Sequence, residues 1–264
     1  MAKRREVRRF GPGPFVLGLQ RLYRGDEFPF NVPAVADVEQ LDLSRSVTLL
    51  TGENGSGKST ILEAIAGAIG FAEQGGELER LGELPAVPRN VLGRVLGEDG
   101  VPLLAPVLSR TRPRNGYFLR AESFFNLAEF IDSGDKFAPD LSIYGDVPLH
   151  QQSHGESFLA LAANRFGGDS LYLLDEPEAA LSVTAALALL GIVTRAANAG
   201  AQFVIATHSP ILLAAPAAQI YELDEDGLNT PVYDDLQAVR QMRGFLAAPD
   251  QYLRQIANDP ETDD

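Results

Sequence analysis

The chain has 264 residues, 45% of them hydrophobic and 22% charged, which is enough for one large packed domain or two small ones. It contains no cysteine, so disulfides, thiolate metal sites and cysteine nucleophiles are excluded. The net charge of −14 disfavours a broad nucleic-acid surface, and no apolar run reaches the roughly 18 residues that span a bilayer. No signal-peptide pattern is visible, so we expect a cytoplasmic protein without a membrane span of its own.

The charge is unevenly distributed along the chain. Residues 1–24 carry seven basic side chains against one acidic side chain, a balance of +6, whereas residues 258–264 form an acidic tail. The basic segment could contact DNA, RNA or an acidic protein. A solvated tip is the simpler interpretation, and it is the one that we favour.

Strands and helices are expected to alternate along the chain. Between residues 70 and 116, frequent glycine and proline predict only short strands and loops. Apolar runs predict buried strands, and 3.6-residue periodicity predicts helices. The expected strands are Val47–Thr51, Tyr117–Leu119, Leu171–Leu174, Phe203–Ala206 and an edge strand at Ile220–Leu223. The expected helices are Ser59–Ile69, Ser123–Ile131, Glu156–Phe166 (capped by Ser153), Pro177–Asn198 and Pro249–Ala257, with a loop at Phe137–Gln152. This order predicts an α/β fold with a mainly parallel sheet.

A phosphate-binding loop follows the first of these strands. The sequence from Gly52 to Ser59 fits G-x-x-x-x-G-K-S, in the strand–loop–helix context that this pattern requires. Backbone N–H groups of such a loop and the N-terminus of the next helix surround phosphates. Lys58 would reach the β- and γ-phosphates of ATP, and Ser59 would bind Mg²⁺. The candidate nucleotide-binding residues are Gly52, Glu53, Asn54, Gly55, Ser56, Gly57, Lys58, Ser59 and Thr60.

Acidic residues end the apolar strand at Leu171–Leu174. Asp175 is a candidate to complete the Mg²⁺ site through water, and Glu176 to orient and polarise the attacking water. An Asp-Glu pair after a strand is also a common helix cap, but downstream of a phosphate loop the catalytic interpretation is favoured. For Glu178 we expect a solvated position in the first turn of the following helix.

Two further motifs have no evident use in a lone nucleotide-binding domain. The first is Ser153-His154-Gly155-Glu156, which alone would be a capped helix start. The second contains His208 after a buried strand, which alone would be a structural histidine. Both make sense if two copies of the chain close around ATP.

With these motifs in this order, the chain resembles the ABC-type ATPases. The four residues from Ser153 to Glu156 resemble the signature S-G-G-Q or S-G-G-E of that family, although His154 replaces a glycine. Gly155 and Asp175 are 20 residues apart, and Asp175 and His208 are 33 apart, as in the family layout. The resemblance implies one P-loop NTPase domain over 1–264, with a small antiparallel β region and a helical signature subdomain at about 117–168.

The resemblance also implies roles for individual residues. Of the signature residues Ser153, His154, Gly155 and Glu156, the serine and the glycine would bind the γ-phosphate held by the other protomer, which makes the protein an ATP-sandwiched homodimer. For His154 we expect a surface position, from which it could add a donor to the phosphate. His208 would sense the γ-phosphate and hold the attacking water. Two family features depart from the pattern: Ser182 replaces the D-loop aspartate, and Glu122 is the nearest candidate for the Q-loop glutamine at the metal. Phe28 and Phe30 are candidates for stacking on adenine, although core packing suits them better.

Three functions remain open. The loop with Glu53 and Asn54 resembles those of RecF and SMC heads, but no coiled-coil heptads appear, so small stand-alone bacterial ATPases are the nearest match. The first function is an ATP-hydrolysing homodimer that couples nucleotide state to a protein partner or DNA. The second is the energy-coupling subunit of an ABC transporter, which the missing Q-loop pattern disfavours. The third is a slow nucleotide-gated interaction module, which Glu176 disfavours.

Overall fold

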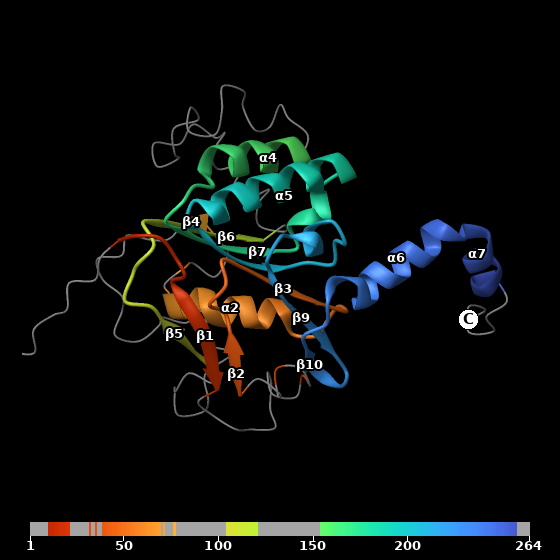
Figure 1. The fold of residues 1–264 in the computed structure, drawn as a ribbon, viewed down its shortest axis with the longest axis horizontal. Coiled ribbons are helices and arrows are strands. Elements are labelled where there is room, and N and C mark those ends of the chain that lie inside the picture. The colour runs from red at the N-terminus through yellow and green to blue at the C-terminus, as the bar shows by residue number, and fades with distance from the viewer. Residues whose placement is uncertain are drawn as a thin grey trace, which may run out of the picture.

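The computed structural model describes residues 10–21, 32, 35, 39–69, 71, 76–77, 104–120 and 154–257. Their centre is a seven-stranded sheet with the order β10-β9-β3-β8-β7-β6-β4 (Figure 1). The five inner strands pair in parallel, and the edge strands β10 and β4 are antiparallel to their neighbours. In this order the strands are β10 (Gly227–Asn229), β9 (Gln219–Asp224), β3 (Val47–Gly52), β8 (Gln202–Ala206), β7 (Ser170–Asp175), β6 (Asn115–Arg120) and β4 (Gly76–Glu77).

Helices cover both faces of this sheet, and its central strands β3, β8 and β7 are accordingly buried along almost their whole length. All six residues of β7 are buried: Leu171 and Leu173 pack on one side, and Tyr172 and Leu174 on the other, as alternation along a strand requires. The first side holds helix α2 (Lys58–Ile69), and the second holds α4 (His154–Arg165) and α5 (Val183–Asn198) (Figure 1).

A small antiparallel sheet packs on the α2 side, with the order β2-β1-β5. Its strands are β1 (Val16–Arg21), β2 (Gln40–Asp42) and β5 (Leu104–Leu108). One buried side chain links it to the large sheet. The amide of Gln202 in β8 accepts hydrogen bonds from the backbone N–H of Phe15 and Val16, and donates to the carbonyls of Val16 and Leu43.

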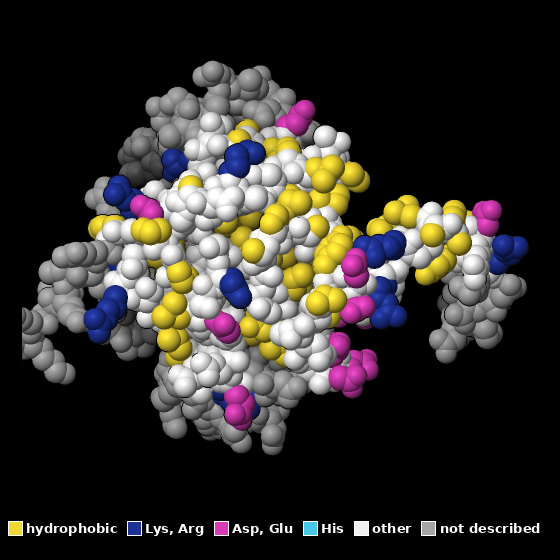
Figure 2. All heavy atoms as spheres, in the orientation of Figure 1, with side chains coloured by type: hydrophobic (Ala, Val, Ile, Leu, Met, Phe, Trp, Pro, Cys, Tyr) yellow, Lys and Arg dark blue, Asp and Glu magenta, His cyan; other side chains and the backbone are white. Residues whose placement is uncertain are grey.

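The C-terminal helices lead away from this body. Short 3₁₀ turns (Leu212–Ala214 and Tyr233–Asp235) precede α6 (Gln237–Ala247), which α7 (Pro249–Ala257) follows. Figure 1 shows α6 and α7 projecting as an arm, and Figure 2 shows apolar side chains exposed on it. These exposed residues are Met242, Phe245, Leu246 and Leu253. None of the helices in the described part of the chain is long and apolar enough to cross a membrane.

The α/β class, the mainly parallel sheet and the small antiparallel sheet are confirmed. The long helix predicted over Pro177–Asn198 is wrong: a 3₁₀ turn covers Pro177–Ala180, and α5 begins separately at Val183. Ser182 is the N-cap of α5, since its Oγ accepts from Ala185 N at 3.2 Å. The predicted edge strand is second from the edge, because the unexpected β10 pairs with it. The predictions for Ser123–Ile131, Phe137–Gln152 and the tail 258–264 lie outside the described residues.

Candidate nucleotide-binding site

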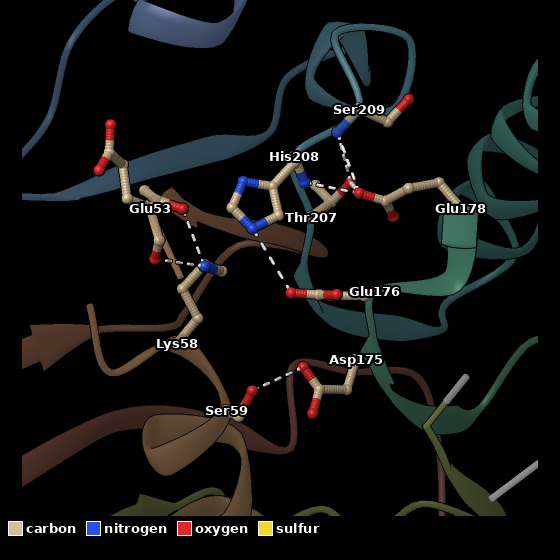
Figure 3. Close-up of polar contacts among 10 residues, drawn as sticks. Glu53, Lys58, Ser59, Asp175, Glu176, Glu178, Thr207, His208 and Ser209 are labelled. Atoms are coloured by element: carbon tan, nitrogen blue, oxygen red, sulfur yellow. Dashed lines mark hydrogen bonds and ion pairs between the residues drawn. The ribbon is translucent and has the colours of Figure 1, made fainter. Parts of the chain in front are cut away.

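Three parallel strands carry the site at their carboxyl ends. The strands β3, β8 and β7 are neighbours, in register from Leu50 to Ala206 and from Ala206 to Asp175. The phosphate loop follows β3, the acidic pair ends β7, and Thr207 and His208 follow β8, so the side chains meet at one edge of the sheet (Figure 3). This edge of an open parallel sheet is where ligands bind in such folds.

Glycine is required in the loop after β3. Gly52 has φ +138°, and a Cβ there would lie 2.0 Å from Leu223 O; a Cβ on Gly57 would lie 2.6 Å from Val35 Cγ2. The backbone can therefore fold close to its neighbours. Of the remaining loop residues, Glu53, Asn54 and Gly55 are exposed, and Ser56 and Thr60 are half-buried.

Lys58 is held across this loop. Its side chain is buried, and Nζ donates to Gly52 O at 2.8 Å and to Glu53 O at 2.9 Å. Burial lowers the pKa of Lys58, while the negative charges of Glu176, Asp175 and Glu178 oppose that shift. The ammonium therefore lies among three carboxylates, at the start of helix α2.

Oxygen donors for a divalent cation come together beside Lys58. Ser59 Oγ donates to Asp175 Oδ1 at 3.0 Å, so a hydroxyl and a carboxylate from α2 and β7 lie side by side. Burial raises the pKa of Asp175, which the Ser59 hydrogen bond and the charge of Arg120 partly offset. Hard oxygen ligands that leave room for water and phosphate suit Mg²⁺. The pair therefore fits the cation that the sequence predicted.

Arg120 is a member of this cluster that sequence reasoning missed. It ends β6 opposite Asp175, with Nε 3.5 Å from Asp175 Oδ2 and Nη1 2.9 Å from Glu63 Oε1. The sequence did offer a signal: a basic residue, Arg120, ends the predicted strand that precedes the one ended by Asp175. The guanidinium offsets part of the negative charge around the cation position.

Glu176 and His208 face each other at the same edge. Glu176 has φ +49° and ψ +51°, a left-handed conformation that non-glycine residues seldom adopt, and it turns the chain sharply after β7. Its Oε1 lies 3.4 Å from His208 Nε2, an ion-pair distance without the alignment of a hydrogen bond. Backbone strain of this kind is concentrated at functional sites.

Glu178 is not the solvated residue that the sequence predicted. Its Oε1 accepts hydrogen bonds from Thr207 Oγ1 at 2.7 Å, His208 N at 2.6 Å and Ser209 N at 3.0 Å (Figure 3). The error has a physical cause: the predicted continuous helix would have placed Glu178 on its outer face, whereas the 3₁₀ turn directs it to the loop after β8.

The last three residues of the signature motif lie on the other side of the sheet. They begin α4, with Gly155 half-buried and Glu156 exposed. Helix α4 covers the face opposite to α2 (Figure 1). Ser153, Glu122, Phe28 and Phe30 lie outside the described residues, so their predicted roles stay predictions.

The C-terminal arm begins beside the site, which the sequence did not suggest. Gln237, the first residue of α6, donates through Nε2 to Glu53 Oε1 at 3.3 Å and through its backbone N to Glu222 Oε1 at 2.9 Å. Just before it, Tyr233 OH donates to Pro210 O at 2.9 Å, in the segment that follows His208.

Known proteins are similar in sequence to much of the chain. The family model "AAA domain" matches residues 30–80, and "AAA domain, putative AbiEii toxin, Type IV TA system" matches residues 126–214. The cytochrome c biogenesis ATP-binding export protein CcmA of Nitrobacter winogradskyi is 30% identical over 172 residues, covering 65% of this chain and 82% of CcmA. CcmA of Gluconobacter oxydans is 31% identical over 195 residues, covering 73% and 80%.

The fold likewise matches a solved structure of this kind. The solved structure described as "An inward-facing conformation of a putative metal-chelate type ABC transporter" aligns with a TM-score of 0.51 at 17% identity, covering 88% of this chain and 89% of that chain. The identity and coverage of the CcmA proteins decide the family, and this likeness agrees in fold. The chain therefore belongs to the ABC-type ATPases, P-loop enzymes that bind and hydrolyse ATP.

Proposed function

We propose that the protein binds ATP with Mg²⁺ at this edge of the sheet, hydrolyses it between two copies of the chain, and couples its nucleotide state to a separate protein or DNA. The observation that carries the proposal is the convergence of three elements: the buried Lys58, the Ser59–Asp175 pair at 3.0 Å and the Glu176–His208 pair at 3.4 Å. They supply a cation for phosphate, ligands for Mg²⁺ and a base beside a phosphate sensor.

The phosphates would lie over the loop, where backbone N–H groups and the start of α2 favour negative charge. Lys58 Nζ, now bonded to two loop carbonyls, would turn to the β- and γ-phosphates. Ser59 and Asp175 would hold Mg²⁺, which when bound neutralises developing charge on the phosphates. Arg120, within 3.5 Å of Asp175, would keep the carboxylate oriented.

Hydrolysis would follow from the Glu176–His208 geometry. Glu176 accepts a proton from water as the water oxygen bonds to the γ-phosphorus, and the bond from that phosphorus to the bridging oxygen of ADP breaks. His208 orients the γ-phosphate and the water. The left-handed turn at Glu176 fixes the direction of its carboxylate before the substrate arrives.

The dimer rests on a separate argument. The described signature residues are in the first turn of α4, on the side of the sheet away from α2, so they have no evident task at the phosphates of their own chain. A helix N-terminus with Ser153 and Gly155 is suited to an anion held by a second copy. We also propose that the protein acts in the cytoplasm, as expected from the sequence.

Two variants test the proposal. Lys58→Ala should lose ATP binding, measured with a fluorescent nucleotide, and Glu176→Gln should bind ATP, stall before hydrolysis and accumulate as a dimer in size-exclusion chromatography. Asp234→Ala, which removes only an exposed ion pair with Arg243, should behave as wild type. Normal turnover by Glu176→Gln would remove Glu176 from its role as base.

The composite site has its own test. Hydrolysis per milligram should rise with protein concentration in the dilute range, and Ser153→Arg should prevent dimerisation while leaving ATP binding intact. A rate strictly proportional to concentration would contradict a shared site.

The likeness to CcmA favours a second candidate, the energy-coupling subunit of an ABC transporter, because those relatives are ATP-binding export proteins. A Glu176→Gln trap purified from detergent-solubilised membranes decides between the two. Recovery of a polytopic membrane protein with the trap would support the transporter. A trap that remains in the soluble fraction would support the stand-alone enzyme.

A further inference from the structure

Glu178 connects two catalytic segments that are far apart in sequence. It lies two residues after Glu176, yet its three hydrogen bonds go to Thr207, His208 and Ser209. Resting on the function proposed above, we propose that Glu178 is a positioning residue: it fixes the loop that carries His208 relative to the turn that carries Glu176.

The geometry is that of a carboxylate bound in a backbone pocket. Two successive N–H groups, from His208 and Ser209, converge on Glu178 Oε1 at 2.6 and 3.0 Å, and the Thr207 hydroxyl adds a third donor at 2.7 Å. Successive N–H groups of this kind form an anion-binding concavity. Here the anion belongs to the protein itself.

Burial makes this contact hard to replace. Thr207 has no exposed surface, and Glu178 Oε2 is buried without a hydrogen-bond partner. Water therefore has little access to the Thr207 hydroxyl if the carboxylate is removed, whereas His208 and Ser209 are half-buried. Loss of Glu178 would leave the loop to find another arrangement, because buried donors seldom remain unpaired.

The Glu178 side chain joins the two segments at the point where the strand hydrogen bonds end. Strand hydrogen bonds hold both segments up to the ends of β7 and β8, where Glu176 N donates to Ala206 O and Thr207 N donates to Leu50 O, each at 2.9 Å. Beyond those points, the Glu178 carboxylate is what joins the described residues of the turn to His208 N and Ser209 N. The separation between Glu176 Oε1 and His208 Nε2 is therefore set by Glu178.

The expected effect falls on turnover rather than on ATP binding. Lys58, Ser59 and Asp175 make their contacts without Glu178. Glu178→Ala should therefore lower kcat about 100-fold, as expected for a displaced catalytic group, with KM and ATP affinity within about 2-fold of wild type. Glu178→Gln keeps an oxygen that accepts from all three donors, so it should retain activity within about 5-fold of wild type.

A double-mutant cycle distinguishes positioning from a general structural role. His208→Ala alone should lose most of the turnover, and adding Glu178→Ala to it should cost less than about 2-fold more, since a residue that acts through His208 has nothing left to position. All rates are measured at a temperature where circular dichroism shows each variant folded, and Asp234→Ala is the control for loss of a carboxylate elsewhere.

Each outcome has a clear meaning. The proposal would be overturned if the kcat losses of Glu178→Ala and His208→Ala multiply in the double variant. It would also be overturned if Glu178→Ala turns over ATP as fast as wild type. If Glu178→Ala does not fold, Thr207→Val takes its place in the same cycle, because it removes one of the three donors and keeps the side-chain volume. Wild-type protein without Lys58-dependent ATP hydrolysis would instead refute the proposed function, so the two failures are distinguishable.

Discussion

The loss of stability on removing the buried amide of Gln202 can be predicted from its individual hydrogen bonds. Its side chain is fully buried, with Oε1 2.7 Å from Phe15 N and 2.9 Å from Val16 N, and Nε2 2.7 Å from Val16 O and 2.6 Å from Leu43 O. Gln202→Ala removes all four bonds and leaves four buried backbone groups without this partner.

The magnitude follows from the number of bonds. A typical hydrogen bond contributes about 1 kcal/mol net, and an unsatisfied buried partner costs about 1–3 kcal/mol, so we expect Gln202→Ala to lower the free energy of unfolding by about 4 kcal/mol or more. Because domains of this kind are stable by only about 5–15 kcal/mol, the variant should be close to its folding limit. The loss should appear first as separation of the small sheet from the large one.

Urea denaturation followed by circular dichroism measures this loss. Gln202→Met fills the volume without the bonds, so it should remain nearly as unstable as Gln202→Ala, which separates hydrogen bonding from packing. Gln219→Ala is the matched control, since that half-buried glutamine makes one side-chain bond, to Ile220 O at 3.2 Å. A Gln202→Ala midpoint that corresponds to a loss below about 1 kcal/mol would refute the reasoning.

Three further predictions concern the site. Gly52→Ala should abolish ATP binding and destabilise the protein by roughly 3 kcal/mol, because its Cβ would lie 2.0 Å from Leu223 O at φ +138°. Nucleotide titration measures the binding and urea midpoints measure the stability. A variant that binds ATP would contradict this prediction. Lys58→Met should lose ATP binding and lower the urea midpoint, because Gly52 O and Glu53 O lose the ammonium that now donates to them at 2.8 and 2.9 Å; a variant that still binds ATP or is more stable than wild type would oppose this. Mg²⁺ binding should weaken on the acid side at a higher pH than an ordinary aspartate implies, because burial raises the pKa of Asp175 in the metal-free protein and the proton competes with the cation. That same shift contributes stability below pH 3.8 that is lost as pH rises through the raised pKa, so Asp175 itself does not favour acid unfolding. Mg²⁺ titrations of wild type and Arg120→Leu at several pH values check this: the affinity of Arg120→Leu should begin to fall at a still higher pH, and a pH dependence like that of an ordinary aspartate would contradict it.

Local sequence was sufficient to predict those elements of the fold that follow from a short sequence pattern. The apolar run of β7 and the glycine pattern at Gly52–Ser59 each determine a structure within a few residues, so the strand, the loop and helix α2 were predicted correctly. The order of the motifs was also enough to predict the ABC-type fold. Asp175, Glu176 and His208 were singled out because they follow buried strands, and in parallel strands such ends meet.

Contacts made by long-range packing could not be predicted in this way. Glu178 and Gln202 depend on partners 31 and 187 residues away at their most distant contacts, and nothing in their own neighbourhood indicates those partners. The prediction of one helix over Pro177–Asn198 was wrong because the apolar pattern continues across the break between the 3₁₀ turn and α5. Ser182 lies in this break and caps α5. The β1 strand was missed because its burial depends on β2 and β5, which are short and distant in sequence.

The start of α6 and the 3₁₀ turn before it lie at the edge of the nucleotide site. Gln237 is bonded to Glu53 in the phosphate loop, and Tyr233 is bonded to Pro210, two residues beyond His208. A rotation of α6 about its root therefore has to stretch one of these bonds or carry the neighbouring loop with it. The projecting helices are therefore attached at their base to the phosphate loop and to the segment after His208, so their position depends on the position of both.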